Sequence, residues 1–193
     1  DVIAFHRAGV KYCVAPLGTA LTDQQVQILK RYTSEGLLGF DGDAAGLKAA
    51  ERGLSVCEKG GIDCSVIALS EGSDPAEIVE KDGPEALKNL LEYPINGFTF
   101  IVEKAKQGVD VSKASGKEQV VRHIVPFLTE VQSEVRREAY IHEVADALQV
   151  DPESVQRDIT RIRDGAYTRR PDVDAPKTVR LTADLFLMLA VAA

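Results

Sequence analysis

Apolar and polar residues follow two different periods along residues 1–95. Short apolar runs at 12–16, 36–41 and 63–69 are bounded by turn residues, as buried strands are. The stretches around these runs place apolar residues three or four positions apart, which is typical of amphipathic helices. Strands that alternate with helices at this spacing predict βαβ units. Runs that are apolar on both faces predict a parallel sheet covered by helices.

Start and stop signals indicate where several of these helices begin and end. Thr22 followed by Gln25 predicts a capping box, in which each side chain accepts a hydrogen bond from the other residue's backbone. Gly60 and Gly61 predict the end of the longest helix. A helix at the very start of the chain implies a strand before residue 1. We expect helices over 1–9, 21–33, 43–61, 74–83 and 84–92, the last two with a proline near the first turn.

Beyond about residue 95 the strand pattern stops and helical periodicity takes over. Residues 166–180 contain prolines and many charges, which predicts a linker. We therefore expect an α/β domain over 1–95 that lacks its first strand, a helical subdomain over 96–165, the linker, and the beginning of a further domain in an apolar helical pattern over 181–193. Because the chain starts without methionine and ends inside that pattern, we expect a piece of a larger protein.

Charge and composition narrow the function classes. The net charge is −7, with nine Lys and Arg against fifteen Asp and Glu in residues 1–95. Phosphate contacts need basic side chains, so a nucleic-acid role would depend on bridging metal ions or on a basic surface outside this chain. No apolar run reaches the roughly 18 residues of a membrane span, and the N-terminus has no signal-peptide pattern. The three cysteines form no CxxC pair, which predicts reduced thiols in a cytoplasmic protein and no zinc site.

Carboxylates recur where the predicted strands end. Asp41 and Asp43 follow the second strand, in the stretch GFDGDAAG, and Asp74 follows the third. Ligands of open parallel sheets bind beyond the carboxyl ends of the strands, so these side chains are expected at one edge, together with Asp1. Two like charges this close favour a shared divalent cation such as Mg²⁺, which takes carboxylate and phosphate oxygens as ligands. The alternative is structural, because Asp43 and Asp74 are also favourable helix N-caps.

Three further residues are weaker candidates for contact with a substrate. Gly18 and Thr19 follow the first strand, where a loop can approach phosphates, although a simple turn explains them equally well. Lys48 lies in the first turns of the helix after Asp43. It can reach a phosphate from there or remain solvated at the surface.

Residues 138–163 allow a second interpretation, because two helices joined by a short turn are typical of a helix-turn-helix. Asp151 can cap the second helix, and Arg157, Arg161 and Arg163 lie on or near one side of it. A DNA-reading module would carry more positive charge and more polar side chains that reach bases, so ordinary helix packing is the alternative.

The stretch FDGDAAGLKAA, together with SDPAE further on, closely resembles the toprim domain, which carries a DxD after a strand and a metal-dependent site at the sheet edge. Other segments resemble the bacterial, DnaG-like primases within that family. These segments are DVIAFHRAGV, PLGTALTDQQVQIL, GSDPAEIVEKDGPEAL, REAYIHEVADALQVDPESVQRDI and LTADLFLMLAVAA. In the first of them, Asp1 matches the aspartate of the primase motif Glu-Gly-Tyr-x-Asp-Val. The last is similar to the beginning of the helicase-interacting C-terminal domain. The resemblance implies an α/β fold with a toprim-type parallel sheet, followed by an all-α helical subdomain.

The resemblance implies a DNA primase, a DNA-directed RNA polymerase that makes short RNA primers for replication. It implies that Asp41 and Asp43 are catalytic and bind Mg²⁺ or Mn²⁺, that Asp74 extends the metal site and that Asp1 supports it. It implies a single-stranded DNA template, ribonucleoside triphosphates and the replicative helicase as partners, the last through a C-terminal domain that is mostly missing here, and no membrane. Ala76 stands where many primases have an aspartate, and it cannot bind a metal.

The same resemblance places a metal-site glutamate four positions before Asp1, outside this chain. We therefore expect the piece alone not to make primers efficiently. Two other classes stay open. One is another toprim enzyme, a nuclease or a topoisomerase, although none of the five tyrosines carries the signature of a nucleophile that holds DNA. The other is a non-catalytic toprim scaffold, in which the aspartates act only as caps.

Overall fold

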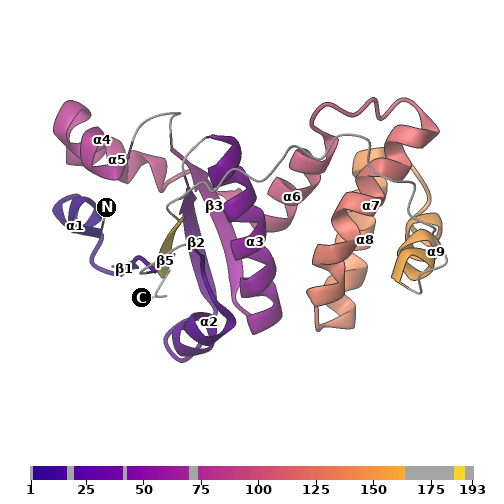
Figure 1. The fold of residues 1–193 in the computed structure, drawn as a ribbon, viewed down its shortest axis with the longest axis horizontal. Coiled ribbons are helices and arrows are strands. Elements are labelled where there is room, and N and C mark those ends of the chain that lie inside the picture. Colours follow the sequence, from indigo (N-terminus) through magenta and orange to yellow (C-terminus); the bar gives the residue numbers. More distant parts are fainter. Residues whose placement is uncertain (1, 17–19, 41–42, 70–73, 164–184, 190–193) are drawn as a thin grey trace. The chain divides into compact units, whose positions relative to one another are not determined.

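A mixed sheet with the order β1-β5-β2-β3-β4 lies at the centre of the first part of the chain (Figure 1). The computed structural model describes residues 2–16, 20–40, 43–69, 74–163 and 185–189. β2 and β3 are parallel, whereas β5 is antiparallel to both of its neighbours and β4 is antiparallel to β3. The strands are β1 (Cys13–Val14), β2 (Glu35–Phe40), β3 (Asp63–Ala68), β4 (Ile95–Asn96) and β5 (Leu185–Leu189).

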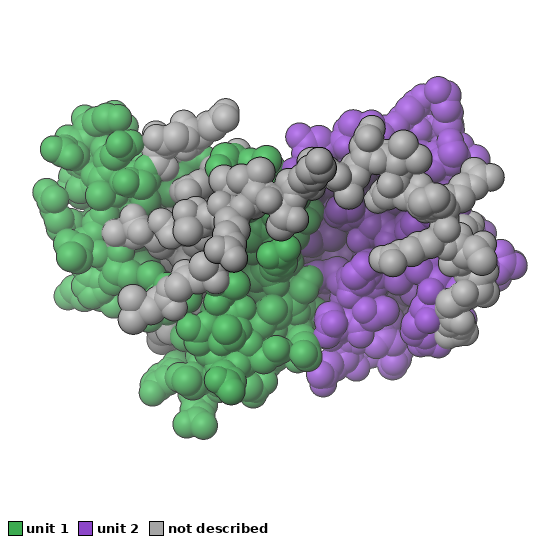
Figure 2. All heavy atoms as spheres, viewed as in Figure 1, with its two compact units in different colours: residues 1–97, 181–193 green, residues 98–180 purple. Residues whose placement is uncertain are grey.

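The chain divides into two compact units, residues 1–97 with 181–193 (unit 1) and residues 98–180 (unit 2) (Figure 2). The described helices of unit 1 are α1 (Val2–Arg7), α2 (Asp23–Leu29), α3 (Ala44–Gly60), α4 (Pro75–Asp82) and α5 (Pro84–Leu90). Each helix that follows β1, β2 or β3 confirms the predicted strand–helix alternation. The predicted division of the chain into four parts stays a prediction.

Local capping signals position the helices as the sequence predicts. Thr22 and Gln25 form the capping box, in which the Gln25 amide donates to Thr22 Oγ1 and the Thr22 amide donates to Gln25 Oε1. α3 ends at Gly60, and Gly61 adopts a left-handed conformation with a φ of 76°. Prolines occupy the first turns of α4 and α5. These signals act within a few residues, so they can be read from the chain itself.

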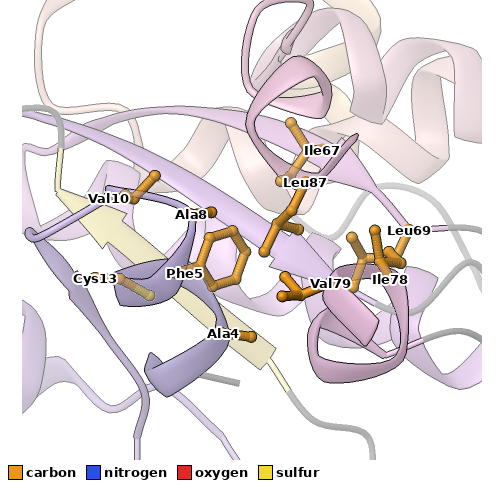
Figure 3. Close-up of a cluster of buried hydrophobic side chains, with 10 residues drawn as sticks. All are labelled: Ala4, Phe5, Ala8, Val10, Cys13, Ile67, Leu69, Ile78, Val79 and Leu87. Carbon is orange, nitrogen blue, oxygen red and sulfur yellow. The ribbon is translucent and has the colours of Figure 1, made fainter. Parts of the chain in front are cut away.

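Helices cover both faces of the sheet (Figure 1). α3 packs along β2 and β3 on one face, and α2 packs against α3. Their approach is close at Gly60, because a Cβ there would lie 2.2 Å from Cγ1 of the buried Val26. The other face carries a hydrophobic cluster that joins α1, β1, β3, α4 and α5, with Phe5 fully buried within it (Figure 3). Its members are Ala4, Phe5, Ala8, Val10, Cys13, Ile67, Leu69, Ile78, Val79 and Leu87.

Two features of the sheet differ from the sequence prediction. Residues 185–189 form a strand, so the helical pattern expected over 181–193 is wrong at these positions. A short apolar run does not distinguish a buried strand from a buried helix, and here pairing with β1 and β2 decides for the strand. β4 is also unexpected, because a two-residue strand is too short to show a period.

Unit 2 is helical in its described residues, as predicted. Its helices are α6 (Gly97–Lys106), which starts at the boundary with unit 1, α7 (Ala114–Glu130), α8 (Glu134–Leu148) and α9 (Pro152–Arg163). Three aromatic rings hold the core together: Phe98 stacks on Tyr140 with centroids 4.0 Å apart, and Phe127 lies 5.7 Å from Phe98. Thr99 of α6 donates to the Glu143 carboxylate of α8 at 2.8 Å. Across the described residues, no helix has the length and apolar character that crossing a bilayer requires.

Candidate functional site

The parallel register of β2 and β3 brings the ends of both strands to one edge of the sheet, called the carboxyl edge below. Phe40 pairs with Ala68 at the last position of both strands. The register continues one residue further, because the Leu69 amide donates to the Phe40 carbonyl at 3.0 Å. The segments that follow the two strands therefore start side by side, and each leads into a helix.

Asp43 stands at the N-terminus of α3, on the carboxyl edge. Its backbone is extended, with a φ of −83° and a ψ of 171°, and its Oδ1 accepts a hydrogen bond from the Gly46 amide at 2.6 Å. The predicted N-cap is thus confirmed. Asp43 is exposed and forms no ion pair with any described residue, so its other carboxylate oxygen is available to a ligand.

Asp74 has the same role at the N-terminus of α4. Its Oδ1 accepts from the Glu77 amide at 2.7 Å, and Pro75 occupies the first turn. The Asp74 side chain is also exposed and without an ion pair among the described residues. The Glu77 carboxylate instead faces Lys81 at 3.6 Å, an exposed pair one turn apart. This pairing favours Asp74 over Glu77 as the acidic group of the edge.

Four predicted site residues lie outside the described residues: Asp1, Gly18, Thr19 and Asp41. Their roles therefore stay predictions. Lys48 is exposed on α3 and makes no hydrogen bond or ion pair with the described residues. Its position is therefore compatible both with contact to a phosphate and with a solvated lysine at the surface. Among the described residues no three His, Cys, Asp or Glu side chains cluster closely enough to hold a metal.

The carboxyl edge combines two chemical features. Capping carboxylates offer oxygen ligands to a hard cation. The amino ends of α3 and α4, which follow β2 and β3 at this edge, carry the partial positive charge of helix N-termini and favour phosphate oxygens. The carboxylates of this edge are predicted from the sequence. The residue that the sequence analysis does not predict is the buried Gly46, whose backbone amide donates a hydrogen bond to Asp43. Its position three residues after an N-cap is the signal that identifies it.

The three cysteines of unit 1 are buried, and the thiols of Cys13 and Cys64 are held in the protonated form. The hydrogen bond with Cys57, together with burial and neighbouring charges, strongly raises the pKa of the Cys64 thiol. Burial raises the pKa of Cys13 to about 11. Thiols held in the protonated form are poor nucleophiles and poor metal ligands.

Two arginines of the candidate helix-turn-helix, Arg157 and Arg161, contact residues of their own helix. Arg157 donates to the Glu153 carbonyl and to Ser154 Oγ, and Arg161 lies 3.9 Å from Asp158. α8 and α9 instead border a groove of about 770 Å³ whose lining carries charges of both signs. Helix packing therefore accounts for this segment better than base reading does.

Comparison with known proteins agrees with this arrangement. Residues 1–79 match the family described as Toprim-like, and residues 98–153 match the DnaB-helicase binding domain of primase. A DNA primase from Clostridium acetobutylicum is 33% identical over 146 residues, which are 76% of this chain and 24% of that protein. The solved DnaG catalytic core matches with a TM-score of 0.70 and 29% identity, over 79% of this chain and 51% of that one.

The chain belongs to the bacterial DnaG-like primases. A second primase structure, of a DnaG catalytic domain bound to ssDNA, matches with a TM-score of 0.69 and 28% identity over 79% of this chain and 50% of that one. The chain spans about a quarter of the length of the curated primase it matches. The predicted toprim-type fold and primase family are thus confirmed, with the antiparallel strands β4 and β5 as differences in the sheet.

Proposed function

We propose that this chain forms part of the catalytic centre that makes RNA primers on a DNA template, at the replication fork in the cytoplasm. The observation that carries the proposal is the parallel register of β2 and β3, which delivers the capping carboxylates of Asp43 and Asp74 to one sheet edge. Membership of the primase family supports the reaction class. The chemistry is the attack of a ribose 3′-hydroxyl on the α-phosphate of a ribonucleoside triphosphate, with loss of pyrophosphate.

The residues present fit a divalent cation. Asp43 and Asp74 are exposed carboxylates that form no ion pair with the described residues, and carboxylate oxygens are the ligands that Mg²⁺ and Mn²⁺ take. We propose that Asp41 and Asp43 hold the cation, that Asp74 adds a further carboxylate and that Asp1 supports them. When bound, the cation would neutralise charge that develops on the phosphates.

The chain's own contribution is positioning. The cap bond at 2.6 Å fixes Asp43 against α3, so that the carboxylate does not have to be ordered when nucleotide arrives. The amino ends of α3 and α4 favour the triphosphate, and Lys48 would reach it from α3. No described side chain is required as a general base.

The template requires positive charge that this part of the chain lacks. Residues 1–95 carry nine Lys and Arg against fifteen Asp and Glu. A solved relative is described as bound to ssDNA. We propose that this chain meets single-stranded template only through bound cations and through a basic surface supplied beyond residues 1–95.

A chimera tests the proposal. The segment of the Clostridium acetobutylicum primase that matches this chain is replaced by the chain, and template-dependent ribonucleotide incorporation is measured. We expect incorporation, and a loss of at least 100-fold in Asp41→Asn and Asp43→Asn, because each variant removes one negative ligand charge. Asp63→Asn, at the opposite end of β3, is the control and retains activity. A folded chimera whose activity survives both edge substitutions would contradict the proposal.

Two other outcomes would identify the rival classes. A covalent protein–DNA adduct would indicate a topoisomerase. A heat stability that neither metal nor Asp41→Asn changes would favour a scaffold in which the aspartates are only caps.

Contact with the replicative helicase is a second proposed function, favoured by the match of residues 98–153 to the DnaB-helicase binding domain of primase. On the strength of this match we propose that the contact lies in unit 2, whereas the sequence analysis expects it after residue 180. Pull-down of the helicase by the chain and by a variant that ends at Arg180 separates the two. Equal capture by both supports unit 2, and capture lost on truncation supports the C-terminal segment.

A further inference from the structure

A groove of about 770 Å³ lies between α8 and α9, within unit 2. The two helices pack against each other (Figure 1). The lining runs from Glu134 to His142 along α8 and from Asp151 to Arg157 at the start of α9. Eight residues of helix rise about 12 Å, so the groove is long enough to hold about two turns of a helical segment.

The cations in the lining of this groove already have acceptors within the chain. Four carboxylates and two guanidinium groups line it. Arg137 Nη1 lies 2.7 Å from Glu134 Oε1, so these two charges neutralise each other. Arg157 donates to the Glu153 carbonyl at 3.2 Å and to Ser154 Oγ at 3.3 Å. Its donors are therefore partly committed to its own helix.

Two carboxylates in the lining have no such partner. Glu138 and Glu153 are exposed, and their carboxylates make no hydrogen bond or ion pair with the described residues. Glu153 lies in the first turn of α9, where a negative charge stabilises the helix N-terminus. Glu138 lies beyond the first turn of α8, where this effect has faded. The charge of Glu138 therefore has no local structural role.

Apolar side chains accompany Glu138 on the same helix. Ile141 lines the groove and is buried, three positions after Glu138. Val135, three positions before Glu138, is 78% exposed, and no other large hydrophobic residue is exposed in the part of unit 2 that the structure describes. Residues three positions apart lie on the same side of a helix. The groove thus combines an unpaired carboxylate with an exposed and a buried apolar contact, each one turn away from it.

We propose that the groove between α8 and α9 is a docking surface for a basic, amphipathic segment of a partner protein. A lysine or arginine of the segment pairs with Glu138 and Glu153, and aliphatic side chains one turn away cover Val135 and Ile141. The excess of carboxylates complements a cationic segment and disfavours nucleic acid, whose phosphates need basic contacts.

Fluorescence anisotropy with a labelled peptide tests the proposal on the full chain. The probe is a helical peptide of about ten residues in which lysines and leucines recur every three or four positions. In the control peptide, glutamate replaces each lysine. We expect saturable binding of the lysine peptide, weakened by salt, and no binding of the glutamate peptide. Equal binding of both peptides would overturn the proposal.

Three variants locate the binding. We expect Glu138→Gln to weaken binding of the lysine peptide roughly fivefold and Val135→Ser roughly threefold. The matched control is Glu80→Gln, which removes an exposed carboxylate of unit 1 that has no partner among the described residues. It should change the affinity by less than about twofold. Equal effects of Glu138→Gln and Glu80→Gln would show attraction to the net charge alone and would overturn the proposal.

Chemical cross-linking gives a readout that needs no variant. A carbodiimide joins a lysine amine of the bound peptide to a nearby carboxylate, and mass spectrometry locates the bond. We expect cross-links at Glu138 or Glu153, whereas cross-links confined to unit 1 would overturn the proposal. A dimer of the chain that the peptide dissociates would show that a second copy fills the groove, and would also overturn it. None of these readouts involves primer synthesis or the helicase, so they do not depend on the proposed function.

Discussion

The cap at Asp43 allows the structural and the chemical role of one carboxylate to be separated. Asp43 Oδ1 accepts from the Gly46 amide at 2.6 Å, and Gly46 is buried. Asp43→Ala removes this acceptor and leaves an amide that water reaches poorly. Asp43→Asn keeps an acceptor of nearly equal capping strength but removes the charge.

The expected magnitudes follow from these differences. Loss of an N-cap costs about 1 kcal/mol, and the burial of Gly46 moves the estimate for Asp43→Ala toward about 2 kcal/mol. For a unit of about 100 residues this lowers the thermal midpoint by roughly 4–8 °C per kcal/mol. Asp43→Asn should change the free energy of unfolding by only a few tenths of a kcal/mol, within the spread of good capping residues.

The stability of both variants is measured by urea and thermal unfolding, followed by far-ultraviolet circular dichroism. The same titrations are repeated with and without Mn²⁺. We expect Asp43→Asn to match the unsubstituted chain without metal and to lose stabilisation by metal. If Asp43→Ala leaves the unfolding midpoint unchanged, the cap does not hold α3. If Asp43→Asn costs as much as Asp43→Ala, the charge and not the cap bond is responsible.

Three further predictions concern the packing around the site and in unit 2. Gly97→Ala would bring a Cβ to 2.3 Å from the Cys64 carbonyl oxygen, which is backbone and cannot move aside, so thermal denaturation should show a loss of about 1–3 kcal/mol. Because burial raises the pKa of Cys13 from 9.0 to about 11, the folded state binds that proton more tightly than the unfolded state. The urea midpoint of unfolding should therefore stay constant below pH 9 and fall between pH 9 and 11. Cys13→Ala should remove the share of this fall that comes from the Cys13 thiol. A double-mutant cycle of Phe98→Leu and Tyr140→Leu should give a coupling of about 1 kcal/mol, because the rings are stacked 4.0 Å apart; additive losses would show that stacking contributes nothing.

The sequence predicts the parts of this fold that local chemistry decides. The capping box of Thr22 and Gln25 and the N-caps Asp43 and Asp74 each involve residues three positions apart, and all form as expected. The apolar runs of β2 and β3 are also clear in the sequence, because the later positions of both strands are apolar and face helices on both sides of the sheet.

Non-local pairing explains what the sequence does not predict. The run at 185–189 is apolar throughout, so its sequence fits a helix or a strand. Only pairing with distant strands, among them β2 about 150 residues earlier, makes it a strand. The carboxylates of the candidate site are recognisable in the sequence because each stands between a strand and the helix that follows it. Asp41, the other half of the DxD, lies outside the described residues, so its position beside Asp43 stays a prediction.

Mn²⁺ titration of the chain, followed by isothermal calorimetry, tests the central claim that the carboxyl edge binds a divalent cation. The compared proteins are the unsubstituted chain, the double variant Asp41→Asn/Asp43→Asn and the control Asp63→Asn. The account predicts saturable binding that the double variant weakens at least tenfold and the control does not change. Equal affinity in all three proteins, or no binding by the unsubstituted chain, would contradict it.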